Sequence, residues 1–191
     1  SSFYLCQRIC MKTERTHIEG LLVITPTVFK DDRGYFFESF NHKAFENHTS
    51  SSINFVQDNQ SKSEKNVLRG LHFQNPPFDQ GKLVRVITGS VLDIAVDIRK
   101  NSPTYGEHFK IILDTQKHQM LWIPSGFAHG FISLEDDTIF SYKCTNYYNK
   151  EAEGCILYND QNIGIDWEVK EPILSKKDKL GENFNTFVSQ F

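Results

Sequence analysis

The sequence has little that would suit a membrane, a nucleic acid or a disulfide framework. Its 191 residues include four cysteines, with no Cys-x-x-Cys pair and no dense spacing, so we expect reduced thiols and a cytoplasmic protein. No apolar run approaches the roughly 20 residues that span a bilayer. The net charge of −3 at pH 7 provides no basic footprint for nucleic acid or an anionic membrane surface.

The first ten residues are too short and too mixed in polarity for a secretory signal. Met11 is a candidate natural start, which would make residues 1–10 a loose N-terminal arm or a cloning remnant. Residues 11–191 contain no repeat, low-complexity linker or break in composition. We therefore expect this stretch to be a single domain with a sizeable core.

Short extended segments, separated by Gly, Pro and Asn turns, dominate the chain. This pattern predicts an all-β fold, a jelly-roll β-sandwich or barrel with one or two short helices. The expected helices are 41–46, capped by Asn41, and 175–180, capped by Ser175. The expected strands are 20–24, 35–40, 53–60 (fraying into a polar loop), 67–74, 83–87, 91–99, 109–113, 119–123, 131–134 and 138–143.

The clearest alternation lies in residues 91–99. Leu, Ile and Val occupy one face, while Asp93, Ala95, Asp97 and Arg99 occupy the other, which predicts a strand with an apolar and a polar side. The preceding Gly-Ser pair at 89–90 predicts a hairpin turn.

Three polar side chains stand inside or beside strand-like apolar sequence, where burial without a partner is costly: Arg69, His72 and Lys82. Strict alternation would place Arg69 and His72 on opposite faces, but a bulge at Gly70 would re-aim one of them. Two strands carrying inward polar groups indicate the walls of a pocket. The alternative is an exposed arginine, a satisfied core histidine and a solvated lysine.

The pattern Pro124-x-Gly126-x-x-His129 is similar to the second motif of the cupin superfamily, in which such a histidine binds metal. The first cupin motif needs His-x-His, and the corresponding place here holds His72-Phe73-Gln74. One imidazole cannot supply the three protein ligands that a catalytic metal usually has. The sequence therefore predicts a pocket without metal.

Several longer motifs, in one order from about residue 16 to 178, resemble the dTDP-4-dehydrorhamnose 3,5-epimerase family. They are Asp32-Arg33-Gly34-x-Phe36-Phe37-Glu38-Ser39, Gln57-Asp58-Asn59-x-Ser61-x-Ser63, Val67-Leu68-Arg69-Gly70-Leu71-His72-Phe73-Gln74, Gly81-Lys82-Leu83-Val84, Val96-Asp97-Ile98-Arg99, Pro124-x-Gly126-Phe127-Ala128-His129-Gly130-Phe131 and Tyr142-Lys143-x-Thr145-Asn146-Tyr147-Tyr148.

The resemblance implies a cupin-type fold and a dTDP-4-keto-6-deoxy sugar substrate inverted at C3 and C5, with no cofactor. Both carbons are α to the C4 carbonyl, so each proton can leave to form an enolate. The resemblance makes His72 the base, Asp178 the carboxylate that orients it, Tyr142 the acid on the opposite face and Lys82 the group that stabilises the enolate.

The resemblance also implies a set of substrate contacts, in which arginines suit the diphosphate and Tyr148 stacks on the thymine. Tyr142 and Tyr148 could instead be aromatic side chains of the core. Glu153 and Lys177 could instead be solvated residues at the rim. Asp93, on the polar side of its strand, is a further candidate, for holding His129 or Lys82. The implied contacts are Arg33, Glu38, Gln57, Asn59, Arg69, His129, Tyr148, Glu153 and Lys177.

Three functions remain open at this point. The first is the 3,5-epimerase, acting in dTDP-L-rhamnose and polysaccharide biosynthesis. The second is a single-carbon epimerase or 3,4-ketoisomerase acting on a related dTDP-4-keto sugar. The third is a non-catalytic cupin that binds nucleotide sugars. The resemblance further implies a homodimer, since the edges of a jelly roll invite pairing.

Overall fold

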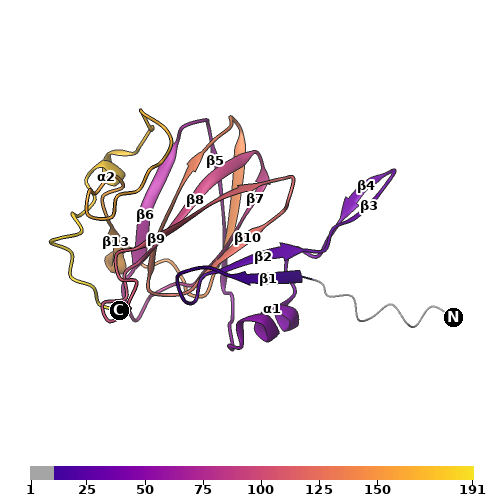
Figure 1. Cartoon of the computed structure of the whole chain (residues 1–191), viewed down its shortest axis with the longest axis horizontal. Helices are drawn as coiled ribbons and strands as arrows, with labels where there is room; N and C mark the ends of the chain where they lie inside the picture. The colour runs from indigo at the N-terminus through magenta and orange to yellow at the C-terminus, as the bar shows by residue number, and fades with distance from the viewer. Residues whose placement is uncertain (1–10) are drawn as a thin grey trace.

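The computed structural model describes residues 11–191, so the interpretation of residues 1–10 lies outside the described residues. Two antiparallel sheets face each other (Figure 1). The first has the order β1 (Met11–Arg15), β2 (Leu22–Pro26), β10 (Met120–Ile123), β7 (Lys82–Thr88), β12 (Thr138–Cys144) and β5 (Gln57–Ser63). The second has the order β13 (Glu153–Cys155), β6 (Leu68–Gln74), β11 (Phe127–Ser133), β8 (Ser90–Asp97) and β9 (His108–Asp114).

The main core fills the space between the sheets. Val84, Leu121 and Phe140 of the first sheet pack with Val91 and Phe131 of the second. Each is 4% exposed or less, so burial of these side chains contributes about 1.5–3 kcal/mol apiece. The predicted jelly-roll β-sandwich is confirmed.

The outer face of the second sheet is also buried. Leu92, Ile94 and Val96 of β8 pack there with Trp167 and other apolar side chains of the C-terminal segment, residues 156–191. Figure 1 shows this segment, in yellow, running along the far side of β6 and β9. The polar side predicted for residues 91–99 therefore faces the interior, where Asp93 and Asp97 are fully buried.

The hairpin predicted at residues 89–90 is wrong. β7 pairs with β10 and β12, whereas β8 pairs with β9 and β11, so the chain crosses from one sheet to the other at Gly89. A Cβ added at Gly89 would lie 2.3 Å from the Thr138 hydroxyl oxygen. The glycine reflects this close crossing rather than a two-residue turn.

The strand predicted over 53–60 is displaced. β5 begins at Gln57 and continues through polar sequence to Ser63, paired only with β12 at the edge of its sheet. Edge strands tolerate polar residues on their exposed side. Ile53 and Phe55 instead pack against Trp122 and Phe45 on the outside of the first sheet, because burial there removes their apolar side chains from water.

Both expected helices form. α1 (His42–Thr49) begins after Asn41, whose side chain accepts from the Ala44 backbone N–H, and its Phe45 packs on the outside of the first sheet. α2 (Lys176–Lys179) begins after Ser175, whose hydroxyl accepts from the Asp178 backbone N–H. A 3₁₀ turn, η1 (Lys150–Ala152), precedes β13. Within residues 11–191, no helix is both long and apolar enough to cross a bilayer.

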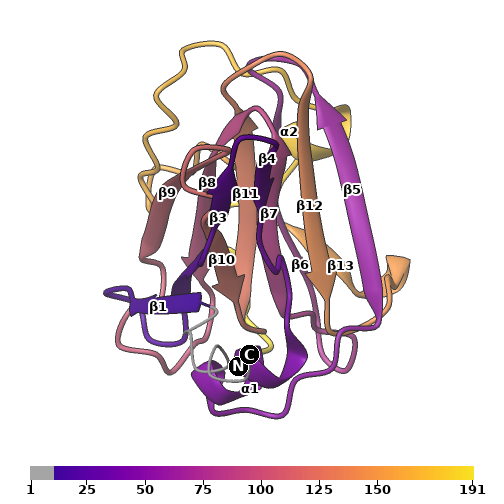
Figure 2. The same cartoon turned by 90° about the vertical axis from the view of Figure 1, so that its right-hand side faces the viewer.

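A small hairpin of β3 (Phe29–Asp31) and β4 (Gly34–Phe36) extends away from the sandwich (Figure 1), and in Figure 2 it lies in front of the sheets. Phe29, Tyr35 and Phe36 are 44%, 58% and 68% exposed. A monomeric soluble protein rarely exposes such a group of aromatic side chains together.

Gly70 forms the predicted bulge in β6. In the pairing with β11, His72 stands opposite His129 and Arg69 opposite Phe131, so β6 holds one residue more than its partner in this interval. Gly70 has φ +135°, and a Cβ there would lie 2.5 Å from the Gly130 Cα. The extra residue puts both Arg69 and His72 on the side of β6 that faces the first sheet, although Arg69 remains exposed, while Leu71 packs outward.

Candidate active site

A pocket of about 100 Å³ lies between the two sheets at the end where β6 and β7 face each other. Residues of β5, β7 and β12 form one wall, and residues of β6 and β13 form the other. The lining residues are Gln57, Asn59, His72, Phe73, Gln74, Gln80, Lys82, Tyr142, Tyr148 and Glu153. Seven of these were expected from the sequence to act on or bind substrate: Gln57, Asn59, His72, Lys82, Tyr142, Tyr148 and Glu153.

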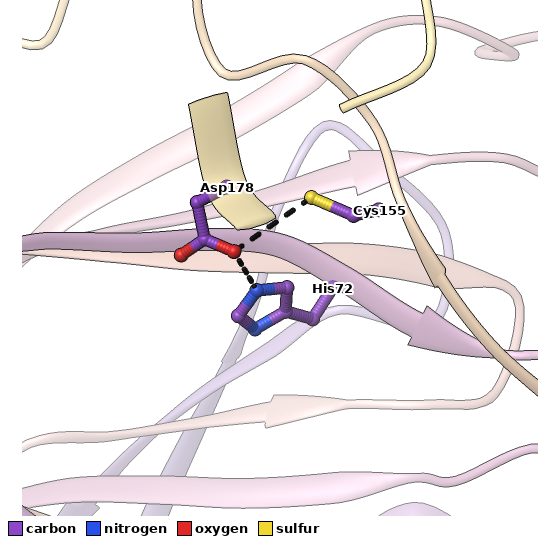
Figure 3. Close-up of side chains that lie close together, drawn as sticks. All are labelled: His72, Cys155 and Asp178. Carbon is purple, nitrogen blue, oxygen red and sulfur yellow. Dashed lines mark hydrogen bonds and ion pairs between the residues drawn. The ribbon is translucent and has the colours of Figure 1, made fainter. Parts of the chain in front are cut away.

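His72 and Asp178 form a close pair. His72 Nε2 lies 2.6 Å from Asp178 Oδ1, and Asp178 Oδ2 accepts from the backbone N–H of Gly70. Burial would raise the pKa of Asp178, but the bond from His72 and that from Gly70 outweigh it and hold the pKa below its usual range. An ionised Asp178 accepts a hydrogen bond from Nε2–H, which leaves the lone pair on Nδ1. Figure 3 shows this second nitrogen on the side of the ring away from Asp178.

Lys82 and Tyr142 stand on the opposite wall, with Lys82 Nζ 5.7 Å from the centre of the Tyr142 ring. Burial lowers the pKa of Lys82, although Cys144 and Asp93 oppose the shift. Burial raises the pKa of Tyr142, which a hydrogen bond with Asn59 partly offsets. The phenol therefore remains protonated at neutral pH and can donate.

A second histidine–carboxylate pair lies behind the pocket. His129 Nε2 is 2.7 Å from Asp93 Oδ1, with side-chain exposures of 6% and 0%. Burial raises the pKa of Asp93, while His129 and Lys82 favour its charged form. Asp93 Oδ2 has no hydrogen-bond partner among residues 11–191. Asp93 thus holds His129, one of the two partners expected for it.

A chain of polar contacts forms the rim. Lys177 Nζ lies 2.5 Å from Glu153 Oε1, and the Tyr148 hydroxyl donates to Glu153 Oε2 at 2.9 Å. Burial would raise the pKa of Glu153, but its contacts with Lys177 and Tyr148 lower it. Tyr148 is 57% exposed, so its ring is not part of the core. The core alternative for Tyr148 is wrong.

Polar side chains of β5 and β6 lie next to the pocket: Gln57 and Asn59 line it, whereas Arg69 is exposed beside it. Arg69 Nε donates to the Ser63 hydroxyl and its Nη2 to the Lys62 carbonyl oxygen, which carries the guanidinium from β6 to β5. Gln57 Nε2 donates to Asn59 Oδ1, and Gln57 Oε1 accepts from the backbone N–H of Tyr148. These residues lie beside Tyr142, in a position to bind polar groups of a substrate.

Arg33 and Glu38 are not brought to this pocket. Arg33 lies in the turn between β3 and β4, with its side chain 90% exposed and bound to Asp31. Glu38 is exposed and accepts from Asn41 Nδ2 at 3.3 Å. Neither belongs to the pocket lining of its own chain.

Cys155 is a neighbour of the site that sequence reasoning missed. It stands directly opposite His72 in the pairing of β13 with β6, and its Sγ lies 3.9 Å from Asp178 Oδ1. Burial raises the pKa of this thiol to about 12. The pairing joins distant parts of the chain, so no local pattern around Cys155 could have revealed it. Cys155 and the buried Cys144 are free cysteines.

His129 lies at the position where the cupin motif has a metal-binding histidine, but its Nε2 is bound to Asp93. Among residues 11–191, the group with metal-ligating atoms within 4.8 Å of one another is His72, Cys155 and Asp178, which is a different place. The site thus lacks the ligand set of the cupin motifs, and the expected absence of a resident metal stays a prediction.

Residues 15–186 match the sequence profile described as dTDP-4-dehydrorhamnose 3,5-epimerase. The chain belongs to the dTDP-4-dehydrorhamnose 3,5-epimerase family. It is 51% identical over 174 residues to the dTDP-4-dehydrorhamnose 3,5-epimerase of Shigella flexneri, covering 91% of this chain and 96% of that protein.

Solved structures agree with membership of this family. The chain is similar, with a TM-score of 0.90 and 45% identity, to a dTDP-6-deoxy-D-glucose-3,5-epimerase from Legionella pneumophila Philadelphia 1 in complex with dTDP-4-keto-L-rhamnose, covering 93% of this chain and 95% of the other. It also resembles a 3'-monoepimerase from Streptomyces bikiniensis in complex with dTDP-quinovose, with a TM-score of 0.86 and 29% identity, covering 91% and 88%. The fold alone therefore does not separate double from single epimerisation.

Proposed function

We propose that the protein inverts C3 and C5 of dTDP-4-dehydro-6-deoxy-D-glucose to give dTDP-4-dehydro-L-rhamnose. The observation that carries the proposal is the placement of His72 on one wall of the pocket and Tyr142 on the other. Inversion needs a base on one face of the sugar ring and an acid on the opposite face. Identity of 51% to the Shigella epimerase favours the double epimerisation.

In this proposal each carbon follows the same steps. His72 Nδ1 takes the proton from C3 or C5, and the electron pair of that C–H bond forms an enolate with the C4 carbonyl. Lys82 stabilises the negative oxygen, as preorganised charge does in other enolate-forming sites. Tyr142 then donates its proton to the opposite face of the same carbon, and solvent restores both groups. No electron leaves the substrate, so no redox cofactor takes part.

Asp178 acts by holding the His72 ring in the tautomer with the proton on Nε2 and by stabilising the imidazolium that forms. Arg69, Gln57, Asn59 and His129 bind polar groups of the nucleotide sugar in this proposal. Tyr148, held by Glu153 and Lys177, is exposed, which suits stacking on the thymine ring. All of these residues belong to one domain, residues 11–191.

The single-carbon epimerase and the non-catalytic binding protein make different predictions in deuterated water. Incubation with dTDP-4-dehydro-6-deoxy-D-glucose in D₂O, followed by NMR, is expected to show deuterium and inversion at both C3 and C5. Label and inversion at one carbon alone would indicate the single-carbon epimerase. Tight binding with no exchange would indicate a binding protein and would contradict the proposed catalytic roles.

We also propose a homodimer, located in the cytoplasm. The exposed aromatic side chains of the β3–β4 hairpin provide an apolar surface for a second copy, and a free thiol at Cys155 suits a reducing compartment. In this dimer the hairpin and the residues just after it carry Arg33 and Glu38 to the pocket of the partner, since neither residue lines the pocket of its own chain.

Mixed dimers test this arrangement. Arg33→Ala and His72→Asn are each expected to be nearly inactive, but a heterodimer of the two contains one site with both changes and one intact site. After unfolding and joint refolding at equal amounts, roughly one quarter of the wild-type activity is expected, from the symmetry of the dimer. No recovery would mean that Arg33 acts, if at all, in its own chain.

A further inference from the structure

Three kinds of side chain that can bind a metal ion meet at Asp178: an imidazole, a carboxylate and a thiol (Figure 3). The sulfur of Cys155 lies 3.9 Å from Asp178 Oδ1 and 3.7 Å from the Gly70 carbonyl oxygen. His72 Nε2 lies 2.6 Å from the same Oδ1. The three ligand atoms are all within 4.8 Å of one another.

This combination of sulfur, nitrogen and oxygen selects among metal ions. Thiolate and imidazole favour zinc and similar borderline metals, whereas Mg²⁺ and Ca²⁺ prefer sites built from oxygen alone. Zinc binds sulfur at about 2.3 Å and nitrogen or oxygen at about 2.0–2.2 Å, so its tetrahedral ligands lie roughly 3.3–3.7 Å apart. The distance between Nε2 and Oδ1 would need to open from 2.6 Å, and that between Sγ and Oδ1 to close from 3.9 Å. Both are side-chain adjustments.

We propose that Zn²⁺ binds to His72 Nε2, Cys155 Sγ and Asp178 Oδ1 and inhibits the protein. Binding of the metal is a property of these three side chains alone. The inhibition rests on the proposed function, because it removes the base that this function assigns to His72.

The inhibition follows from the position of the ring proton. In the metal-free pair, Nε2–H donates a hydrogen bond to Asp178 and Nδ1 keeps its lone pair. Zinc takes the lone pair of Nε2, which moves the proton of the neutral ring to Nδ1, and the thiol releases its own proton to solvent. The ring nitrogen that faces substrate is then a donor and can no longer accept a proton.

The surroundings permit a cation but do not provide a closed structural site. The side chains of His72 and Asp178 are 33% and 5% exposed, so the site is partly open at His72, and its three protein ligands leave the fourth zinc position to solvent. Lys177 opposes a cation near Asp178 and Cys155, but its charge is paired with Glu153. Reversible inhibition is therefore expected, rather than a metal that is retained through purification.

Cobalt provides a direct test of binding. Titration of the full chain with Co²⁺ is expected to give a sulfur-to-cobalt charge-transfer band in the near ultraviolet, which Zn²⁺ abolishes by competition. Cys155→Ser should lose the band. The matched control, Cys6→Ser/Cys10→Ser, removes the thiols outside the described residues and should keep it. A band that persists in Cys155→Ser, or that disappears in the control, would overturn the site.

Inhibition is measured separately. Zn²⁺ is expected to stop solvent exchange and epimerisation, with EDTA restoring both and Mg²⁺ having no effect. Cys155→Ser should keep turnover without metal but need at least about tenfold more Zn²⁺ for half inhibition, since loss of a ligand weakens binding by at least that much. If the cobalt band forms but the protein has no epimerase activity, the proposed function fails and the metal site stands. If the enzyme is active but Zn²⁺ neither binds nor inhibits, the site fails alone.

Discussion

Asp178 lies 106 positions after His72 in the sequence, yet its Oδ1 is 2.6 Å from His72 Nε2. The contact joins α2, in the C-terminal segment, to β6, which lies between β13 and β11 in the second sheet. It fixes the ring, and it places a negative charge where an imidazolium would form.

His72→Asn is expected to lower turnover by at least about a hundredfold, because general-base catalysis contributes an effect of that order. Affinity for dTDP, measured by calorimetry, should change little. Asp178→Asn is also expected to reduce turnover strongly, because an amide can donate to Nε2 and favour the wrong tautomer. Turnover near wild type in His72→Asn would show that another group is the base.

Tyr142→Phe is expected to separate proton exchange from inversion. The change keeps the ring and removes the only donor proposed on that face. His72 could then only return a proton to the face from which it came, so deuterium should still enter C3 while inverted product falls sharply. Loss of exchange and inversion in equal measure, in a well-folded variant, would contradict the two-face assignment.

Removal of metal is expected to leave activity intact. His129 is engaged by Asp93 and the His-x-His motif is missing, so no resident metal is needed for enolisation. Turnover after dialysis against EDTA should equal or exceed the starting value. A loss that a single divalent ion restores would show that a metal does belong to the resting enzyme.

Asp97→Asn is expected to lower the free energy of unfolding by about 2–4 kcal/mol at pH 7, because the carboxylate is buried and paired with Arg99. Burial would raise the pKa of Asp97, but bonds from Arg99, Ser102 and Thr104 lower it below the usual 3.8. This contribution is fully present above pH 4 and is lost as the pH falls through the folded-state value.

Urea denaturation at pH 7 and at pH 3 measures this dependence. The difference between the wild type and Asp97→Asn should shrink on acidification. Glu107→Gln, a change at an exposed carboxylate nearby, is the control and should have little effect at either pH. An equal difference at both values would show that ionisation of Asp97 does not stabilise the fold.

Gly70→Ala is expected to destabilise the fold by several kcal/mol and to reduce activity. A Cβ at this position would meet the Gly130 Cα at 2.5 Å, in addition to the strain of a positive φ, which costs about 1–2 kcal/mol. Gly34→Ala is a matched control, because its φ is +139° but no atom lies within 4 Å of the added Cβ. If both variants lose a comparable amount of unfolding free energy, backbone strain, and not the contact with β11, causes the destabilisation.

Local patterns were sufficient to predict the kind of fold and most of the pocket. The caps at Asn41 and Ser175, the bulge at Gly70 and the walls around His72 and Lys82 all depend on short-range preferences or on long motifs. What failed depended on pairing between distant strands. A Gly-Ser pair where the chain crosses between sheets looks the same in sequence as one in a hairpin turn. The polar residues of β5 form a strand because they pair with β12, a partner distant in the sequence.

The neighbourhood of Cys155 shows the same limit. The pairing that brings Cys155 opposite His72 joins β13 to β6, and nothing in the sequence near either residue specifies it. Likewise, the alternation in residues 91–99 correctly separated two faces, but it could not reveal that the C-terminal segment covers one face. Nor could it reveal that, on the other face, His129 binds one oxygen of Asp93 and Arg99 binds both oxygens of Asp97.

The position of Asp178 in the segment that covers the outer face of the second sheet links catalysis to a local equilibrium. Leu174 and Phe184, on either side of it, pack against the same outer cluster. Segments of this kind open at a free energy below that of global unfolding. Each such opening would carry Asp178 away from His72 while the sandwich stayed folded. The fraction of molecules able to catalyse the reaction at any instant would then depend on the free energy of opening this segment, which hydrogen exchange can measure. It would not depend on the stability of the whole fold, which the melting temperature reports.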